Sequence, residues 1–454
     1  MPFILGANSL TGGYTVDNSL RFDEASTTFL SKASFGTPTS TTKSTVSFWC
    51  KRSLVEEGII FMNDSATFPI AKIYFDSSHR FSYVEFNPTI YVQKTTSALF
   101  RDLSAWSHFV VAVDTTQGSA DNRIKIYHNG TQVTSFAQST VPAQDSNVII
   151  NNNLRTGIGG TGVAGGDGFE GYIAELVRID GQALAPTDFG EFDEDSGIWK
   201  PIDVSGLTFG DNGFYLETKD SGALGADTSG NGNNFTVNNL TAVDQSTDTP
   251  TNNFCTTNPL DQNGGVQFSA GNLNVGSTSA SWRSTRGTFG VAQGKWFYEV
   301  KPSFTGGASL DMMVGWGDFT IAIPSEFSSS SPALTYTAGS GNKQLDGSNT
   351  GYGATYNVDD IIGVAFDADA LTVTFYKNGT SQGTITTGWS SGITWTPIIS
   401  LYGRYSNTKA SFNFGSPPYT ISSGNADANG YGNFEYSVPT GYYSLCTKNL
   451  AEFG

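Results

Sequence analysis

The same strand–turn–strand signature occurs twice in this sequence, over residues 111–130 and again over residues 364–379. In each copy an apolar run stops at an Asp-led turn, and an alternating strand then ends in Asn-Gly. Asn-Gly after an alternating segment is the strongest short hairpin signal, so each copy predicts an antiparallel pair of strands. The spacers and the surrounding residues differ, which favours two separate antiparallel β-sandwiches over a tandem repeat.

The composition supports an all-β chain. Of its 454 residues 53 are Gly, aromatic residues make up 13% and charged residues only 14%, a mixture typical of many turns between aromatic or β-branched strands. No window shows a sustained 3.6-residue apolar period, so we expect few and short helices. The sequence therefore predicts two jelly-roll-like antiparallel β-sandwiches joined by a Gly/Asn/Asp-rich ordered connector. Such sandwiches usually bind other molecules and rarely catalyse reactions.

Charge and cysteine content narrow the class further. The net charge of −17 argues against a nucleic-acid partner, whose phosphates such a surface would repel. No stretch is long enough for membrane insertion, and residues 1–6 lack the basic and long apolar regions of a secretory signal. Cys50, Cys255 and Cys446 are scattered and odd in number, so we expect free thiols in a protein made in a reducing cytosol.

Changes in residue composition along the chain predict four parts. We expect an N-terminal arm over 1–18, a first sandwich over 19–202, a connector or small subdomain over 203–264, and a second sandwich over 265–454. A short helix is expected within 185–201, with Thr187 or Asp188 near its N-cap. The strands expected in the first sandwich are 19–22, one around 46–49, 70–75, 81–86, 89–93, 107–113, 124–127, 147–150 and a central strand ending in a turn over 169–181.

Several of these blocks resemble known families. Ser19-Leu20-Arg21-Phe22, Val46-Ser47-Phe48-Trp49, Trp106-Ser107-His108-Phe109-Val110, the turn at 127–130 and Gly171-Tyr172-Ile173-Ala174-Glu175 make residues 19–200 similar to a laminin-G/concanavalin A-like domain. Blocks at 294–300, 314–316, 359–365, 375–379 and 412–415 make residues 265–450 similar to a SPRY domain.

The whole layout, including the connector motif at 248–254, resembles virion proteins of tailed bacteriophages, especially marine ones. This resemblance implies a virion protein assembled in the host cytoplasm and partnered by other virion proteins. The favoured function is that of a non-enzymatic, receptor- or glycan-binding tail fibre or tail appendage. We expect a homo-oligomer, with a trimer favoured. A capsid decoration protein is the alternative. A polysaccharide depolymerase is a further alternative, and a secreted bacterial adhesin is disfavoured by the missing signal.

Glycoside hydrolases occur on the concanavalin A-like fold, so the resemblance makes paired carboxylates candidate catalytic residues. Glu191 and Asp193 would share one face of a strand, at the separation of an acid pair. The segment follows Pro186 and Asp188 and lacks the Glu-x-Asp-x-Glu pattern of such enzymes, so a solvated acidic loop is favoured. Glu175 and Glu299 lie inside apolar strands, where a buried acid with a raised pKa competes with a structural role, and the structural role is favoured.

Two kinds of binding site remain. Laminin-G-like relatives often bind Ca²⁺ at the sandwich rim, and Asp114, Asp121 and Asp167 are candidate oxygen ligands, with solvated turn residues as the default interpretation. In the second sandwich, Tyr402, Arg404 and Tyr405 form the best candidate ligand-binding cluster, followed by Trp389 and Trp395 near loops. The alternative, that these aromatic residues fill the core or an interface, is favoured.

Overall fold

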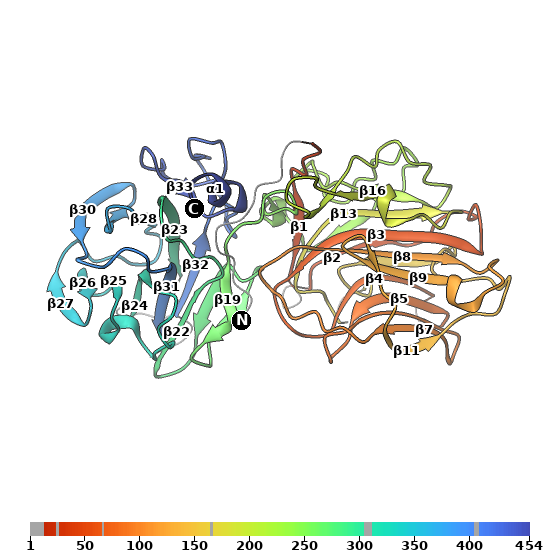
Figure 1. Cartoon of the computed structure of the whole chain (residues 1–454), viewed down its shortest axis with the longest axis horizontal. Helices are drawn as coiled ribbons and strands as arrows, with labels where there is room; N and C mark the ends of the chain where they lie inside the picture. The colour runs from red at the N-terminus through yellow and green to blue at the C-terminus, as the bar shows by residue number, and fades with distance from the viewer. Residues whose placement is uncertain (1–12, 24–26, 66–67, 164–166, 304–310, 404–407) are drawn as a thin grey trace. The chain divides into compact units, whose positions relative to one another are not determined.

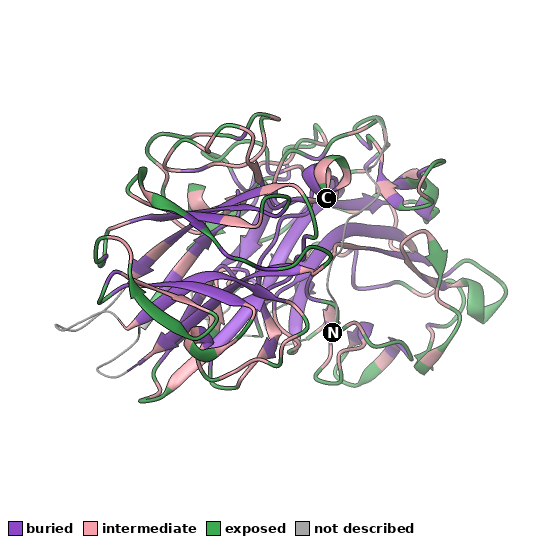
Figure 2. Ribbon diagram, turned by 60° about the vertical axis from the view of Figure 1, so that its left-hand side comes forward, coloured by how far each residue is buried: buried purple, intermediate pink, exposed green. Residues whose placement is uncertain are grey.

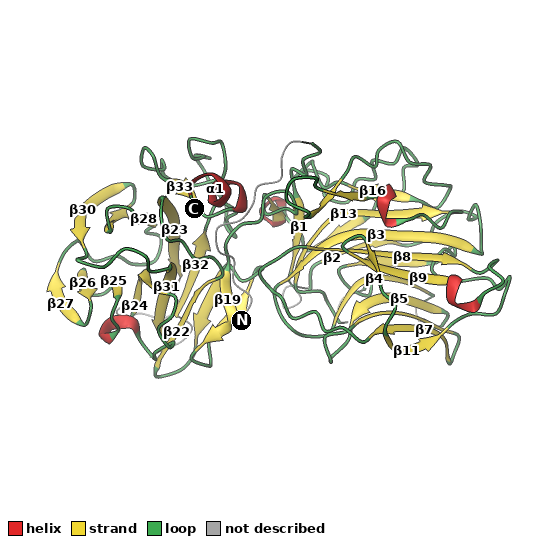
Figure 3. Cartoon of the chain, in the orientation of Figure 1, coloured by secondary structure: helices red, strands yellow, loops and turns green. Residues whose placement is uncertain are grey.

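The computed structural model describes residues 13–23, 27–65, 68–163, 167–303, 311–403 and 408–454. Its contacts divide the chain into two compact units, one containing Leu10–Thr251 and the other Asn252–Gly454. Both are built almost wholly of antiparallel strands, with short helical segments at a few turns (Figures 1 and 3). Within the described ranges we find no helix with the length and apolar character needed to cross a bilayer.

The first unit contains a sheet in the order β10-β9-β8-β3-β13-β1-β18, with β16 also paired to β13. Its strands are β10 (Thr131–Gln132), β9 (Ile124–His128), β8 (Ser107–Asp114), β3 (Lys43–Arg52), β13 (Gly171–Asp180), β1 (Ser19–Phe22), β18 (Gln245–Ser246) and β16 (Phe214–Leu216). β13 is buried along its whole length, which explains why its sequence is apolar on both faces.

The opposing sheet of this unit has the order β11-β7-β6-β5-β4-β12-β2-β17. Its strands are β11 (Phe136–Thr140), β7 (Ile90–Thr96), β6 (Phe81–Phe86), β5 (Ile70–Phe75), β4 (Gly58–Asp64), β12 (Arg155–Ile158), β2 (Phe29–Lys32) and β17 (Thr236–Asn238). Phe48 and Phe109 from the first sheet pack against Phe81 from the second, with the rings of Phe81 and Phe109 stacked at 4.3 Å. The unit is therefore a sandwich closed by an aromatic core, and its inner strands are buried (Figure 2).

A small hairpin follows β13 in sequence. β14 (Gly190–Phe192) pairs with β15 (Trp199–Pro201), after a 3-10 turn η2 (Pro186–Asp188) that takes the place of the expected short helix. Two further 3-10 turns, η1 (Ala120–Asn122) and η3 (Ala242–Asp244), lie within connections.

The second unit contains a sheet in the order β19-β22-β31-β24-β25-β26-β27. Its strands are β19 (Thr257–Gln262), β22 (Trp282–Gly287), β31 (Trp395–Tyr402), β24 (Met312–Asp318), β25 (Ala333–Thr337), β26 (Asn342–Leu345) and β27 (Ser348–Gly351). A 3-10 turn η4 (Phe327–Ser329) precedes β25.

A further sheet of this unit has the order β20-β21-β32-β23-β28-β29-β30, and β33 pairs with β23 in parallel. Its strands are β20 (Gln267–Ser269), β21 (Asn274–Ser277), β32 (Thr408–Asn413), β23 (Lys295–Ser303), β28 (Ile362–Asp367), β29 (Thr372–Lys377), β30 (Thr380–Thr386) and β33 (Tyr443–Ser444), and the helix α1 (Thr447–Phe453) follows. Trp296 from this sheet and Trp316 and Trp395 from the other are fully buried in one shared core, so this unit is also a sandwich.

Both predicted hairpin turns are confirmed. β9 joins β10 through Asn129 and Gly130, which have φ of 45° and 76°, and β29 joins β30 through Asn378 and Gly379, with φ of 49° and 76°. Positive φ at both loop positions is the requirement of the type I′ turn, and Asn and Gly are the residues that accept it most readily.

The connector differs from the prediction. Residues 203–251 add β16, β17 and β18 to the edges and surface of the first sandwich, while the segment from Asn252 onward belongs to the second unit. The isolated aromatic residues explain this, because Phe214 and Phe235 insert into the first core, where Phe214 stacks on Phe35 and Phe235 meets the same ring edge-on.

The strand expected over 147–150 is also corrected. Val148, Ile149 and Ile150 are buried, but their backbone is irregular, with a bend at Ile149 and a turn at Ile150, rather than a strand. The amides of Ile149 and Ile150 donate to the carboxylate of Glu85 at 2.9 and 3.1 Å, which satisfies them without a strand partner.

Candidate functional site

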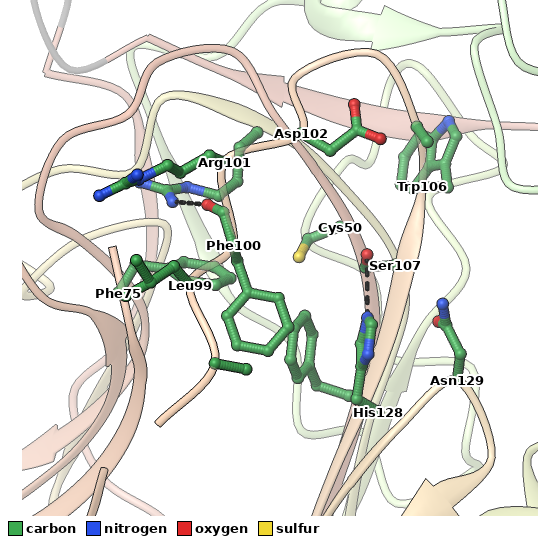
Figure 4. Close-up of a pocket in the computed structure, with 14 residues that line it drawn as sticks. Cys50, Phe75, Leu99, Phe100, Arg101, Asp102, Trp106, Ser107, His128 and Asn129 are labelled. Atoms are coloured by element: carbon green, nitrogen blue, oxygen red, sulfur yellow. Dashed lines mark hydrogen bonds between the residues drawn. The ribbon is translucent and has the colours of Figure 1, made fainter. Parts of the chain in front are cut away.

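A pocket of the first unit lies where β3 ends and β8 begins, beneath the loop that joins β7 to β8. It has a volume of about 430 Å³, within the usual range for small-ligand sites. Its apolar lining comes from both sheets and from this loop: Phe75, Ala98, Leu99, Phe100, Ala105, Trp106 and Phe109. Its polar lining is Cys50, Arg52, Arg101, Asp102, Ser107, His128 and Asn129 (Figure 4).

Trp106 is held in place at this pocket by a buried ion pair. Its indole N–H donates to Oδ1 of Asp248 at 2.9 Å, and Oδ2 of Asp248 lies 2.7 Å from Nζ of Lys51. The side chains of Asp248 and Lys51 are each only 1% exposed. Because the buried carboxylate of Asp248 is itself held by Lys51, its hydrogen bond fixes the orientation of the indole. Trp106 is therefore a pre-oriented aromatic wall of the pocket.

Two guanidinium groups line the pocket. Arg52 lies over the ring of Phe75 at 4.4 Å and donates to the carbonyl oxygens of Phe100 and Glu56. Burial lowers the pKa of Arg52 to about 10, so it remains charged at neutral pH. Arg101 is exposed, and among the described residues neither arginine forms a salt bridge with a carboxylate.

Ser107 and His128 form the pocket's other polar pair. The Ser107 hydroxyl lies 3.2 Å from Nε2 of His128, as Figure 4 shows. Burial lowers the pKa of His128 to about 4, so the ring is neutral near pH 7. The pair lacks a described carboxylate on the other ring nitrogen, which a nucleophilic Ser–His arrangement uses to hold the imidazole.

The lining of the pocket contains one carboxylate, Asp102, and that group already accepts hydrogen bonds from its own loop. Its Oδ1 accepts from the amide and hydroxyl of Ser104 at 2.8 and 2.7 Å. Glycoside hydrolysis of the usual kind needs two carboxyl groups across a sugar. The arrangement is therefore suited to binding by stacking and hydrogen bonding.

The residues predicted to bind a ligand in the second unit differ in their burial and position. Trp395 is fully buried and Trp389 nearly so, and their rings stack at 4.1 Å inside the core. Both tryptophans are thus core residues, and the ligand-binding prediction for them is corrected. Tyr402 is half-buried against Trp282 at 5.5 Å, while Arg404 and Tyr405 lie outside the described residues.

The candidate calcium ligands are not brought together as a site. Asp114 accepts from Thr116 and Gln117 and lies 3.5 Å from Lys43, which is the pattern of a self-contained turn. Asp121 and Asp167 are exposed. No group of three His, Cys, Asp or Glu side chains in the described ranges is placed to hold a metal ion.

Glu191 and Asp193 belong to the β14–β15 hairpin rather than to a cleft. Asp193 accepts from the amide and hydroxyl of Ser196 and from Lys200, and these hydrogen bonds hold the pKa of its carboxyl below the usual value. Lys200 also lies 3.5 Å from Glu191, which is exposed. Both carboxylates are explained by this local pairing.

Buried carboxylates inside the strands have structural partners. Glu299 accepts from the side chain of Asn413 and from the amides of Glu435 and Tyr436, and burial raises its pKa to about 7. Glu85, which sequence reasoning missed, is buried and bound by the hydroxyls of Tyr83 and Tyr91 as well as by the two amides described above.

Glu175 occupies a more unusual position. It lies at a bulge in β13 with φ of +49°, a conformation that non-glycine residues rarely adopt. Its carboxylate is bound by the hydroxyls of Tyr14 and Tyr215, which also contact one another at 3.0 Å. Burial raises the pKa of Glu175 to about 7.

The pocket itself was missed by sequence reasoning, although one signal was present. The segment 97–106 places Leu99, Phe100 and Arg101 together between two strands, and binding residues are disproportionately carried by loops on a rigid scaffold. The link between Trp106 and Asp248 spans 142 positions and has no local signature.

Comparison with known proteins agrees with the two sandwiches. Residues 23–188 match the family model of the Concanavalin A-like lectin/glucanases superfamily, laminin-G type, and residues 295–417 match that of the SPRY domain. The first unit thus carries a concanavalin A-like domain and the second a SPRY domain, and both kinds of domain indicate a binding role.

Similar solved structures include the SPRY domain of human HERC1, at 18% identity over 34% of this chain and 96% of that chain, with a TM-score of 0.31. Another human SPRY domain is 14% identical over 33% of this chain and 94% of that chain, with a TM-score of 0.28. Stonustoxin is 18% identical over 35% of this chain and 27% of that chain, with a TM-score of 0.29.

Proposed function

We propose that this chain is a non-enzymatic binding protein of a bacteriophage particle, a tail fibre or tail appendage that attaches to a glycan or protein on the host surface. The observation that carries the binding part is the pocket at the end of the concanavalin A-like sandwich, with its fixed Trp106 and its two guanidinium groups. A rigid aromatic wall with a few directed polar groups is the usual chemistry of a small-ligand site.

Binding without turnover is supported by the carboxylates of the first unit. Asp102 stands alone in the lining of the pocket and is bound by Ser104, while Glu191 and Asp193 are paired with Lys200. Neither arrangement offers the acid and base that hydrolysis of a glycosidic bond requires.

The placement on a phage particle rests on the resemblance of the whole layout to virion proteins of tailed phages. The net charge of −17 suits a surface protein present at high copy. On this proposal the partners are other virion proteins and further copies of the same chain, a trimer being the expected fibre symmetry.

Electron microscopy of intact particles, labelled with antibody against residues 265–450, tests this placement. Label on tail tips or fibres is the expected result. Label spread over the head would assign the chain to capsid decoration instead, and unlabelled particles would refute the virion proposal.

A further inference from the structure

We propose that the pocket of the first unit binds a saccharide that bears an isolated carboxylate, through the guanidinium of Arg101, with Trp106 as the stacking wall. This inference rests on the proposed binding function and names the ligand class of that same site. It follows from the charges around the pocket, from its fixed aromatic wall and from the charge of the whole chain.

Basic groups converge at one side of the pocket. Arg52 and Arg101 both line it, and the pKa of the nearby His79 is lowered by burial and then by the charges of these same two arginines. The amide of Phe100 donates to the carbonyl of His79 at 2.8 Å, which ties the loop that carries Arg101 to this turn.

The carboxylates near these cations are already engaged. Asp102 is bound by Ser104, and Asp76 accepts from the amides of Ser78 and Arg80 at 2.9 and 2.8 Å. Arg52 uses its donors on two backbone carbonyls, so it supplies charge, whereas Arg101 keeps the donor fork that matches a carboxylate in a bidentate pair.

The opposite side of the pocket suits a sugar ring. Trp106 is fixed by Asp248, so little conformational freedom is lost when a ring stacks on it. Asn129, which also lines the pocket, accepts from the amide of His108 through its side-chain oxygen at 2.7 Å, so its NH₂ group is the end of the side chain that can donate to a sugar hydroxyl.

The charge of the whole chain selects between kinds of anion. With a net charge of −17, the surface beyond the pocket repels a densely charged anionic polymer. A single carboxylate within about 8 Å of the arginines, one Debye length at physiological salt, is attracted by them, while dissolved ions screen the more distant negative charges. A saccharide with spaced carboxylates is favoured over a heavily sulfated one or a nucleic acid.

The test is a glycan array that contains uronic-acid and sialic-acid saccharides, their methyl-esterified forms and neutral saccharides, probed with the full chain. The wild-type chain should bind carboxylate-bearing saccharides and lose them on esterification. Arg101→Gln should weaken binding by at least about tenfold, the scale of one charge-assisted hydrogen bond, and Arg101→Lys should recover part of it. Lys125→Gln removes the same charge from β9 outside the pocket and should have little effect.

Equal binding of acid and ester forms, or binding of neutral saccharides alone, would overturn this ligand class and leave the proposed function standing. Equal losses in Arg101→Gln and Lys125→Gln would assign the effect to general charge and would also overturn it. Failure to bind any saccharide, with particles still labelled at the tail, would overturn the inference while the placement on the particle survives.

Discussion

Replacing Glu175 by Gln should make the first unit more stable at alkaline pH and leave it nearly unchanged at acidic pH. Burial raises the pKa of this carboxyl from 4.5 to about 7, so the folded protein holds its proton more tightly than the unfolded chain does. The stabilisation from this group is therefore complete below pH 4.5, is lost as the pH rises toward 7, and stays lost above it. Gln keeps an oxygen that accepts from Tyr14 and Tyr215 and never ionises.

The size of the effect follows from the shift. A difference of about 2.5 pH units at about 1.36 kcal/mol each amounts to about 3 kcal/mol at pH 8.5. At pH 5 the wild-type carboxyl is mostly protonated in the folded state, so the variant should lie within about 1 kcal/mol of it. Glu217, a like charge that also raises the pKa of Glu175, is kept in both proteins.

Urea unfolding at pH 5 and pH 8.5 measures this difference, with amide hydrogen exchange of β13 reporting on the first unit. Glu194→Gln, at an exposed carboxylate of the same unit, is the matched control and should show little pH-dependent difference. If Glu175→Gln shows the same stability difference from the wild type at both pH values, or a larger loss at pH 8.5, the raised pKa of Glu175 does not control the pH dependence of the first unit's stability.

Three other outcomes follow from the structure. Lys51→Met should lower stability by about 3–5 kcal/mol in urea unfolding because it strands the buried charge of Asp248, and a smaller loss in Lys51→Met/Asp248→Leu would identify the stranded charge as the cause. Trp395→Ala should lower the stability of the second unit by about 3–5 kcal/mol in thermal unfolding and leave saccharide binding unchanged, whereas lost binding would restore Trp395 as a ligand residue. Incubation with EDTA should leave the unfolding temperature unchanged, since the described residues hold no cluster of three metal-ligating side chains, and a clear drop would point to a bound cation.

Much of the fold could be predicted because its signals are local. Asn129-Gly130 and Asn378-Gly379 form the predicted turns since few other residue pairs accept positive φ twice in succession. The central strand β13 was predicted from its apolar residues, but the bulge at Glu175 was not, because it depends on tyrosines that lie far away in the sequence.

The candidate site was harder to predict because its parts come from distant segments. Trp395 closely follows the turn residues Ser390-Ser391-Gly392 in the sequence, yet it starts a strand and lies buried in the core, where it stacks on Trp389. Trp106 was identified only as part of a family block, since its anchor Asp248 lies in the segment that was predicted to be a connector. Burial and long-range pairing decide these roles, and neither has a period that sequence reasoning can detect.

The central claim, that the chain binds its ligand through the pocket of the first unit, is tested most directly by calorimetric titration of one saccharide into three proteins. These are the wild type, Trp106→Ala, and Trp282→Ala as a matched aromatic truncation beside Tyr402 in the second unit. Binding should be lost in Trp106→Ala and kept in Trp282→Ala. Binding kept in Trp106→Ala and lost in Trp282→Ala would contradict this claim and move the site to the SPRY domain.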